Sequence, residues 1–148
     1  MAIVIGSNFG YTVLAAVGIT AQWLIAGFKV SAARIKFKVA YPDNGGGRFS
    51  DKLSDEDWVK FNNIKRVSDN YNEHIGAVLS MLLLAGLFQP KLAASLGGLY
   101  IAGRGIYGWG YTGRGPAGRI YGAPLMAVAL FGLIGTAAWN AASLTILA

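Results

Sequence analysis

The distribution of charged side chains constrains this chain of 148 residues more than any other feature. Only 14% of its residues are charged, and the windows 1–28, 74–90 and 120–148 contain no Asp, Glu, Lys or Arg. A fourth window, 92–113, contains one charged residue, Arg104. A bilayer core of about 30 Å is crossed by about 20 residues of helix. The pattern therefore predicts four membrane spans, at about 9–30, 74–88, 92–111 and 121–147.

The expected fold class is an all-α membrane protein, a four-transmembrane-helix bundle that forms a single domain over residues 1–148. A soluble all-α bundle is the alternative, but its helices would show a polar stripe. Residues 120–148 offer only Asn140 and small hydroxyls, which disfavours that alternative. An unrelated channel or transporter would carry a polar stripe through several spans. The chain has no cysteine, which excludes disulfides, thiolate metal sites and a cysteine nucleophile.

The basic residues predict the topology. Nine of the 13 Lys and Arg residues lie between Lys29 and Arg66, and Arg114 and Arg119 lie between spans three and four. By the positive-inside rule the first and third loops face the cytosol. The chain shows no nucleic-acid footprint.

The segment 31–73 is predicted to form a cytosolic loop followed by a helical extension of span two. Ser54 has the character of an N-cap, and acidic residues at 55–57 suit the first helical turn. No Pro or Gly then interrupts the chain until Gly76, so one helix is expected from Asp55 to Phe88. The third loop, 112–119, is rich in glycine and is expected to be flexible.

Polar residues recur at helical spacing in two places. Asn63, Arg66, Asn70 and Glu73 share one face of the helix before span two, and Arg66 and Glu73 lie too far apart for an i,i+4 pair. A solvated cytosolic face is the simpler reading of this set. In span three, the stripe consists of Tyr100, Arg104, Tyr107 and Tyr111. Because a charge at the bilayer centre costs about 2.5–3.5 kcal/mol, Arg104 is expected to face protein, with snorkelling to the interface as the alternative.

Two further features bear on packing and on metals. Ala94, Gly98 and Ala102 form a small-xxx-small run, which predicts close helix packing or oligomerisation. His74 is the only histidine, its neighbouring acid Glu73 lies on another helix face, and there is no cysteine. A metal site is therefore not expected.

Three of these segments, in order, resemble one known family. Residues 61–73 resemble the Phe-x-x-x-x-Arg-x-x-x-Asn-x-x-Glu signature of the MAPEG family, the membrane-associated proteins in eicosanoid and glutathione metabolism. Residues 103–111 are similar to that family's third span. The flank 31–39 and the Gln89-Pro90 turn are most similar to its type-3 microsomal glutathione S-transferase branch.

The resemblance implies a homotrimer that binds reduced glutathione as a co-substrate between subunits near the cytosolic face. It also implies an intracellular membrane such as the endoplasmic reticulum. The positions matching glutathione-binding residues are Arg34, Arg66, Asn70, Glu73, Tyr107 and Tyr111. Arg104 matches a further arginine of span three, and Arg119 matches the arginine that activates the thiol. Departures at Ile35, Ser68, His74 and Gly76 loosen the substrate assignment.

The function implied by the resemblance is a membrane glutathione transferase and glutathione peroxidase. Its second substrate would be a lipophilic electrophile or lipid hydroperoxide that enters from the surrounding membrane lipids. One alternative is a non-catalytic lipid-binding protein of the same fold, although Arg119 argues against it. Another is a structural subunit of a larger membrane complex.

Overall fold

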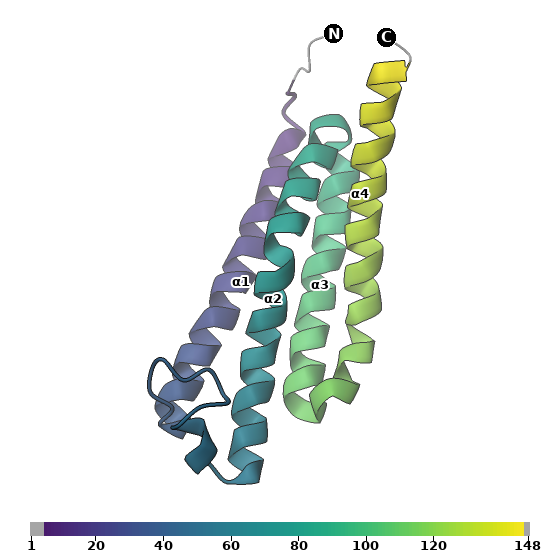
Figure 1. Ribbon diagram of the computed structural model, residues 1–148. Coiled ribbons are helices and arrows are strands. Elements are labelled where there is room, and N and C mark those ends of the chain that lie inside the picture. Colours follow the sequence, from purple (N-terminus) through teal and green to yellow (C-terminus); the bar gives the residue numbers. More distant parts are fainter. Residues whose placement is uncertain (1–4, 147–148) are drawn as a thin grey trace.

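Four long helices lie side by side in the computed structural model, which describes residues 5–146 (Figure 1). Their bounds are α1 Phe9–Phe37, α2 Asp55–Phe88, α3 Pro90–Arg114 and α4 Ala123–Ile146. Two short 3-10 helices, η1 Ser50–Lys52 and η2 Gly115–Tyr121, lie in the connections. Successive helices run in opposite directions, so the first and third connections lie at the same end of the bundle. The predicted all-helical four-helix fold is confirmed.

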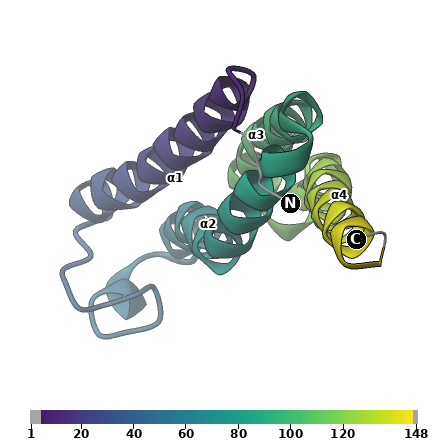
Figure 2. The same ribbon diagram turned by 90° about the horizontal axis from the view of Figure 1, so that it is seen from above.

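Three of the four helices, α1, α2 and α4, are long and apolar enough to cross a membrane. Within the described residues α3 does not reach that hydropathy, because it carries Arg104, several tyrosines and many glycines. It packs against each of the other three helices (Figure 2). Its polar side chains at Tyr100, Arg104 and Tyr107 are buried. The polar character of α3 thus faces protein.

Large apolar side chains lie both inside the bundle and on its outer surface. Ile19, Leu82 and Leu133 are fully buried in the core. Phe28 and Trp139, by contrast, are 69% and 73% exposed. Broad exposed apolar surfaces on helices with satisfied backbones suit contact with lipid. The chain is therefore an integral membrane protein.

Helix α2 begins as predicted. The Ser54 hydroxyl accepts a hydrogen bond from the backbone N–H of Asp57 at 3.2 Å, and the acids at 55–57 occupy the first turn. Lys60 pairs with Glu56 one turn apart at 2.5 Å. The helix then continues without a break to Phe88, so its polar first half and apolar second half form one rigid rod.

The prediction of a flexible third loop at 112–119 is wrong. Helix α3 continues to Arg114, and η2 turns the chain back toward α4. Two glycines allow this, since a Cβ built on Gly118 would meet the carbonyl oxygen of Gly110 at 1.9 Å. The fourth span also begins at Ala123 rather than at 121, because Tyr121 belongs to η2. Its predicted end at 147 lies outside the described residues.

The small-residue run at 94, 98 and 102 does not mediate the helix packing within the protomer. Gly98 is exposed, and a Cβ at this position would meet no atom within 4 Å. The close contacts of α3 with other helices occur at the neighbouring positions, Gly97 before Gly98 and Gly103 after Ala102. A Cβ on Gly97 would lie 2.9 Å from the Cβ of Ala15, and one on Gly103 would lie 3.0 Å from the backbone of Met126. The run therefore remains on the outer surface.

The first connection is organised around the buried carboxylate of Asp43. It accepts hydrogen bonds from the backbone N–H groups of Gly45, Phe49 and Ser50 at 2.7–2.8 Å, and from the Ser50 hydroxyl at 2.9 Å. Burial raises the pKa of Asp43, but these hydrogen bonds outweigh burial and hold that pKa well below its usual range. The loop is therefore closed by an ionised carboxylate.

Protonation of Asp43 is expected to open this loop. Because the folded-state pKa is depressed, the stability it contributes is present above the unfolded pKa of about 3.9 and is lost as pH falls toward the folded value. At neutral pH, Asp43→Asn should have the same effect and increase hydrogen exchange across 43–50. Asp51→Asn, at an exposed acid in the same loop, is the control. Equal exchange in both variants would contradict this prediction.

The Gly110–Gly118 contact is expected to be intolerant of a single added methyl group. Gly118→Ala should lower the free energy of unfolding by about 1–3 kcal/mol, because backbone must move to make room. Gly113→Ala is the matched control, since a Cβ there meets no atom within 4 Å. Thermal unfolding of the detergent-purified proteins compares the two. Similar stabilities would show that η2 does not depend on this approach.

Candidate functional site

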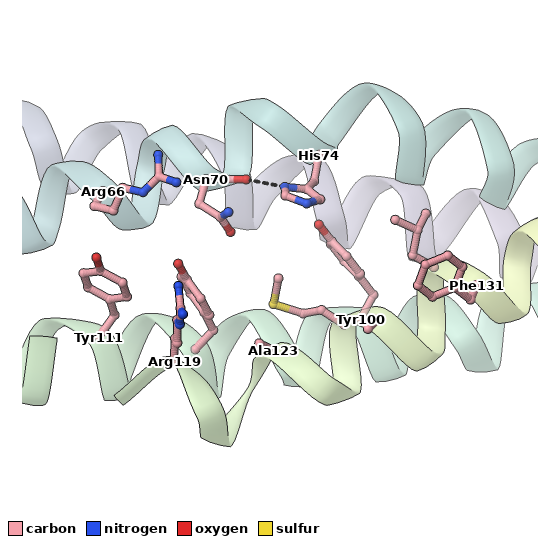
Figure 3. A pocket seen from close by; sticks show the side chains of 12 residues that line it. Arg66, Asn70, His74, Tyr100, Tyr111, Arg119, Ala123 and Phe131 are labelled. Carbon is pink, nitrogen blue, oxygen red and sulfur yellow. Dashed lines mark hydrogen bonds between the residues drawn. The ribbon is translucent and has the colours of Figure 1, made fainter. Parts of the chain in front are cut away.

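A cleft of about 380 Å³ lies between α2, α3, η2 and α4 (Figure 3). Five residues predicted for the site line it together: Arg66, Asn70, Tyr107, Tyr111 and Arg119. The remaining lining residues are His74, Tyr100, Ala123, Met126, Ala127, Leu130 and Phe131. The structure thus brings together side chains from four consecutive elements, at positions between 66 and 131 of the sequence.

The cleft has a polar end and an apolar end. Arg66, Tyr111 and Arg119 lie at the polar end, near the third connection. The polar first half of α2 lies at this same end of the bundle. At the other end of the cleft, α4 contributes Leu130 and Phe131, about two helical turns after its first residue, Ala123. These two side chains form an apolar wall, in which Figure 3 labels Phe131. The cleft can therefore hold a polar molecule and an apolar molecule next to each other.

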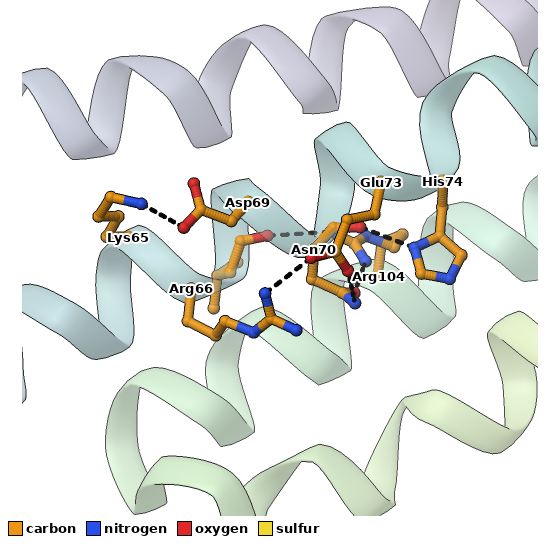
Figure 4. Close-up of polar contacts among 8 residues, drawn as sticks. Lys65, Arg66, Asp69, Asn70, Glu73, His74 and Arg104 are labelled. Atoms are coloured by element: carbon orange, nitrogen blue, oxygen red, sulfur yellow. Dashed lines mark hydrogen bonds and ion pairs between the residues drawn. The ribbon is translucent and has the colours of Figure 1, made fainter. Parts of the chain in front are cut away.

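Arg66 and Glu73 form an ion pair at 2.7 Å, although they lie seven residues apart (Figure 4). Seven residues correspond to about 10 Å of helix, a gap that the two long side chains bridge. The Asn70 amide nitrogen also donates to the other oxygen of Glu73 at 3.2 Å. The spacing of seven residues indicates that the two side chains lie too far apart for the usual i,i+4 pair, yet the structure shows that they pair directly. Glu73 thus contacts both Arg66 and Asn70, which line the cleft, although Glu73 itself does not line it.

Arg104 is buried at the base of this network, with 3% of its surface exposed. Its guanidinium donates to the Asn70 side-chain oxygen at 2.7 Å and to the backbone oxygen of Val67 at 3.1 Å. It also lies 3.9 Å from the centre of the Tyr71 ring, a cation–π distance. The guanidinium therefore faces protein and does not snorkel to the membrane surface.

Arg119 differs from the other arginines of the cleft. It is supplied by η2, and its side chain is exposed and makes no hydrogen bond or ion pair within residues 5–146. The other arginine of this connection, Arg114, donates to the Tyr121 hydroxyl at 2.7 Å and does not line the cleft. Arg119 thus places an uncompensated positive charge in the cleft.

Arg34 lies apart from the cleft. Its guanidinium donates to Val39 and Asn44 of the first connection, at 3.4 and 2.9 Å, and lies 4.2 Å from the Tyr41 ring centre. The structure does not bring it together with the other predicted site residues of the protomer. To contact a ligand in the cleft, it would have to belong to a neighbouring subunit.

Two polar residues of the cleft were not among the predicted site residues. The His74 Nδ1 hydrogen bonds to the backbone oxygen of Asn70 at 2.8 Å, and the buried hydroxyl of Tyr100 has no hydrogen-bond partner. Both follow the spacing of predicted site residues, because His74 lies one turn after Asn70 and Tyr100 lies two turns before Tyr107. Helical periodicity alone could have identified them. The five apolar lining residues come from the first part of α4, 123–131, which contains no polar residue that could have marked them.

Residues 12–139 match the model of the MAPEG family. The chain belongs to the MAPEG family. That family comprises membrane proteins of glutathione and eicosanoid metabolism, and it includes glutathione transferases, glutathione peroxidases and non-enzymes. The match covers α2 and α3 completely and α4 up to Trp139, and it therefore includes every residue of the cleft.

Removal of the buried guanidinium is expected to damage both stability and the cleft. Arg104→Gln should lose its charged hydrogen bonds, each of about 1.5–3 kcal/mol, and leave the Asn70 side chain able to rotate. We expect a lower melting temperature and weaker ligand binding. Arg114→Gln, at an exposed position, is the control. If Arg104→Gln unfolds at the temperature of the control, Arg104 does not hold α2 against α3.

Proposed function

We propose that this MAPEG protein is a membrane glutathione transferase with glutathione peroxidase activity. The observation that carries the proposal is the convergence of Arg66, Asn70, Tyr107, Tyr111 and Arg119 on one cleft. That cleft combines hydrogen-bonding groups, an uncompensated cation and an apolar wall. A reaction between a polar thiol and a lipophilic substrate requires all three.

The charges of the cleft are complementary to glutathione, which carries two carboxylates and one ammonium group. Arg66 can donate to a carboxylate, because guanidinium forms strong charge-assisted hydrogen bonds with it. Glu73 lies beside Arg66 and Asn70 and suits the ammonium group. The Asn70 amide and the hydroxyls of Tyr107 and Tyr111 suit the peptide groups of the ligand. These pairings support glutathione as the co-substrate.

Arg119 is proposed to activate the thiol. A free thiol has a pKa of about 8.5 and is only about 3% ionised at pH 7. A nearby cation that lowers this pKa by about 2 units contributes about 2.7 kcal/mol and makes roughly three quarters of the thiol anionic. Arg119 suits this role because no acid neutralises it within the described residues. The protein needs no cysteine of its own.

The apolar end of the cleft is proposed to receive the second substrate from the bilayer. Phe131 lines the cleft and is also 70% exposed on the outer face of α4. An acyl chain or aromatic group could therefore pass from lipid to the thiolate without crossing water. Lipophilic electrophiles and lipid hydroperoxides have the required chemistry.

A homotrimer is part of the proposal, with loops one and three on the cytosolic face of an intracellular membrane such as the endoplasmic reticulum. Oligomerisation would bring Arg34 of one protomer toward the cleft of another. It would also cover the run formed by the half-buried Ala94 and the exposed Gly98 and Ala102. Both features support an assembly in which clefts lie at subunit boundaries.

The test is thiolate formation in the detergent-purified protein. Titration with glutathione at pH 7 should give a saturable ultraviolet thiolate signal in wild type. In Arg119→Ala, the ionised fraction of the bound thiol should fall from roughly three quarters toward about 3%, and the signal should fall with it. Arg114→Ala should retain the signal. Equilibrium binding of glutathione, measured separately, shows whether the lost signal reflects the thiol pKa or the affinity.

A well-folded wild-type protein that binds glutathione without forming thiolate would contradict the catalytic proposal. The non-catalytic lipid-binding role would then be favoured. Failure to bind glutathione, with stable co-purification of unrelated subunits, would favour a structural role in a larger membrane complex.

A further inference from the structure

The Tyr100 hydroxyl is a buried donor without a partner at the wall of the cleft. Only 1% of the Tyr100 surface is exposed, and its oxygen has no hydrogen bond. An unsatisfied buried polar group costs about 1–3 kcal/mol, whereas phenylalanine would pack the same ring at no such cost. The Tyr100 hydroxyl therefore makes no hydrogen bond that would stabilise the fold of the described residues.

His74 lies on the opposite wall of the cleft, and Figure 3 shows the Tyr100 phenol directed toward it. The His74 Nδ1 must carry a proton to donate to the Asn70 carbonyl oxygen at 2.8 Å. In the neutral ring, Nε2 is then an acceptor. A phenol and an imidazole acceptor thus face the same space from α3 and α2.

This pair lies between the two ends of the cleft. Tyr100 precedes Tyr107 by two helical turns, or about 10 Å along α3, and on the other side the cleft continues to Leu130 and Phe131. A lipophilic substrate that extends from the apolar wall toward Arg119 must pass the hydroxyl. The pair is therefore positioned for the reacting group of the second substrate and not for glutathione.

We propose that Tyr100, assisted by His74, donates the proton to the departing oxygen of a lipid hydroperoxide, which makes hydroperoxides the preferred second substrates. This inference rests on the proposed function, because it needs a thiolate formed near Arg119. An alkoxide is a poor leaving group in an apolar cleft, and a positioned acid typically contributes about 10²–10⁴-fold to such a step.

The chemistry balances with two molecules of glutathione. The thiolate sulfur attacks the terminal oxygen of the hydroperoxide, an S–O bond forms and the O–O bond breaks. The remaining alkoxide takes the Tyr100 proton and leaves as an alcohol, and Tyr100 is reprotonated from solvent through His74. The glutathione sulfenic acid then reacts with a second thiol to give glutathione disulfide and water. Sulfur is oxidised and the peroxide oxygen is reduced.

The test compares two reactions of the same purified protein. Reduction of cumene hydroperoxide needs a proton on the departing oxygen, whereas conjugation of 1-chloro-2,4-dinitrobenzene releases chloride and needs none. In Tyr100→Phe, the ratio of peroxidase to conjugation turnover should fall at least about tenfold. His74→Gln should lower the same ratio by a smaller factor. Tyr11→Phe, at an exposed tyrosine near the start of α1 that does not line the cleft, should leave the ratio at the wild-type value.

Tyr100→Phe is expected to fold, because it removes only an unpartnered hydroxyl. An unchanged ratio in Tyr100→Phe, or equal loss of both reactions in this variant when it is folded, would overturn the inference. If Tyr100→Phe does not fold, an unchanged ratio in His74→Gln has the same meaning. A wild type that forms thiolate but reduces no hydroperoxide overturns this inference and the peroxidase part of the proposed function, and leaves the transferase part standing. A wild type that forms no thiolate overturns the proposed function and this inference with it.

Discussion

The structure depends on one buried cation, the guanidinium of Arg104, held between α2 and α3. An ionised group withdrawn from water needs hydrogen-bond partners, and removing them costs several kcal/mol. Among the described residues those partners are oxygens of Val67 and Asn70 rather than a carboxylate, supplemented by the faces of Tyr71 and Tyr107. Neutral oxygens at fixed positions define one register of the two helices. Because residues of both helices line the cleft, this register determines which side chains face each other across it.

A continuous polar network extends from this buried group to the cleft. Arg104 fixes the oxygen of the Asn70 amide, so the amide nitrogen must point the other way, where it donates to Glu73. Glu73 in turn holds the side chain of Arg66, which is half exposed and available to a ligand. Each step orients the next by a hydrogen bond whose donor and acceptor cannot be exchanged. The polar wall is thus positioned from the core outward.

Residue types and helical spacing predict most of this arrangement. The charge-free windows indicate the helices, Ser54 marks the start of α2, and the periodicity of α2 and α3 identifies the polar stripes. What they cannot predict depends on distance in space. The i,i+7 contact of Arg66 with Glu73 requires two particular side-chain conformations, and η2 requires the backbone contact of Gly110 with Gly118. A glycine-rich sequence is equally compatible with a flexible loop. The contacts of the Arg34 side chain depend on the first connection, whose sequence has no regular repeat.

The two arginines that line the cleft differ in their charge balance, and in the proposed function this difference separates binding from activation. Arg66 is neutralised by Glu73, so it retains its N–H donors but contributes little net potential. Arg119 has no such partner within residues 5–146, so its full charge acts on whatever lies beside it. The potential of a charge is strongest where water is excluded, so a bound ligand that covers the exposed Arg119 side chain would strengthen its effect. In the proposed function, a thiol beside Arg119 would experience a positive charge that a ligand carboxylate at Arg66 does not cancel. The backbone contact that forms η2 therefore has an electrostatic consequence, because it delivers an unpaired cation to the place where an anionic nucleophile would be needed.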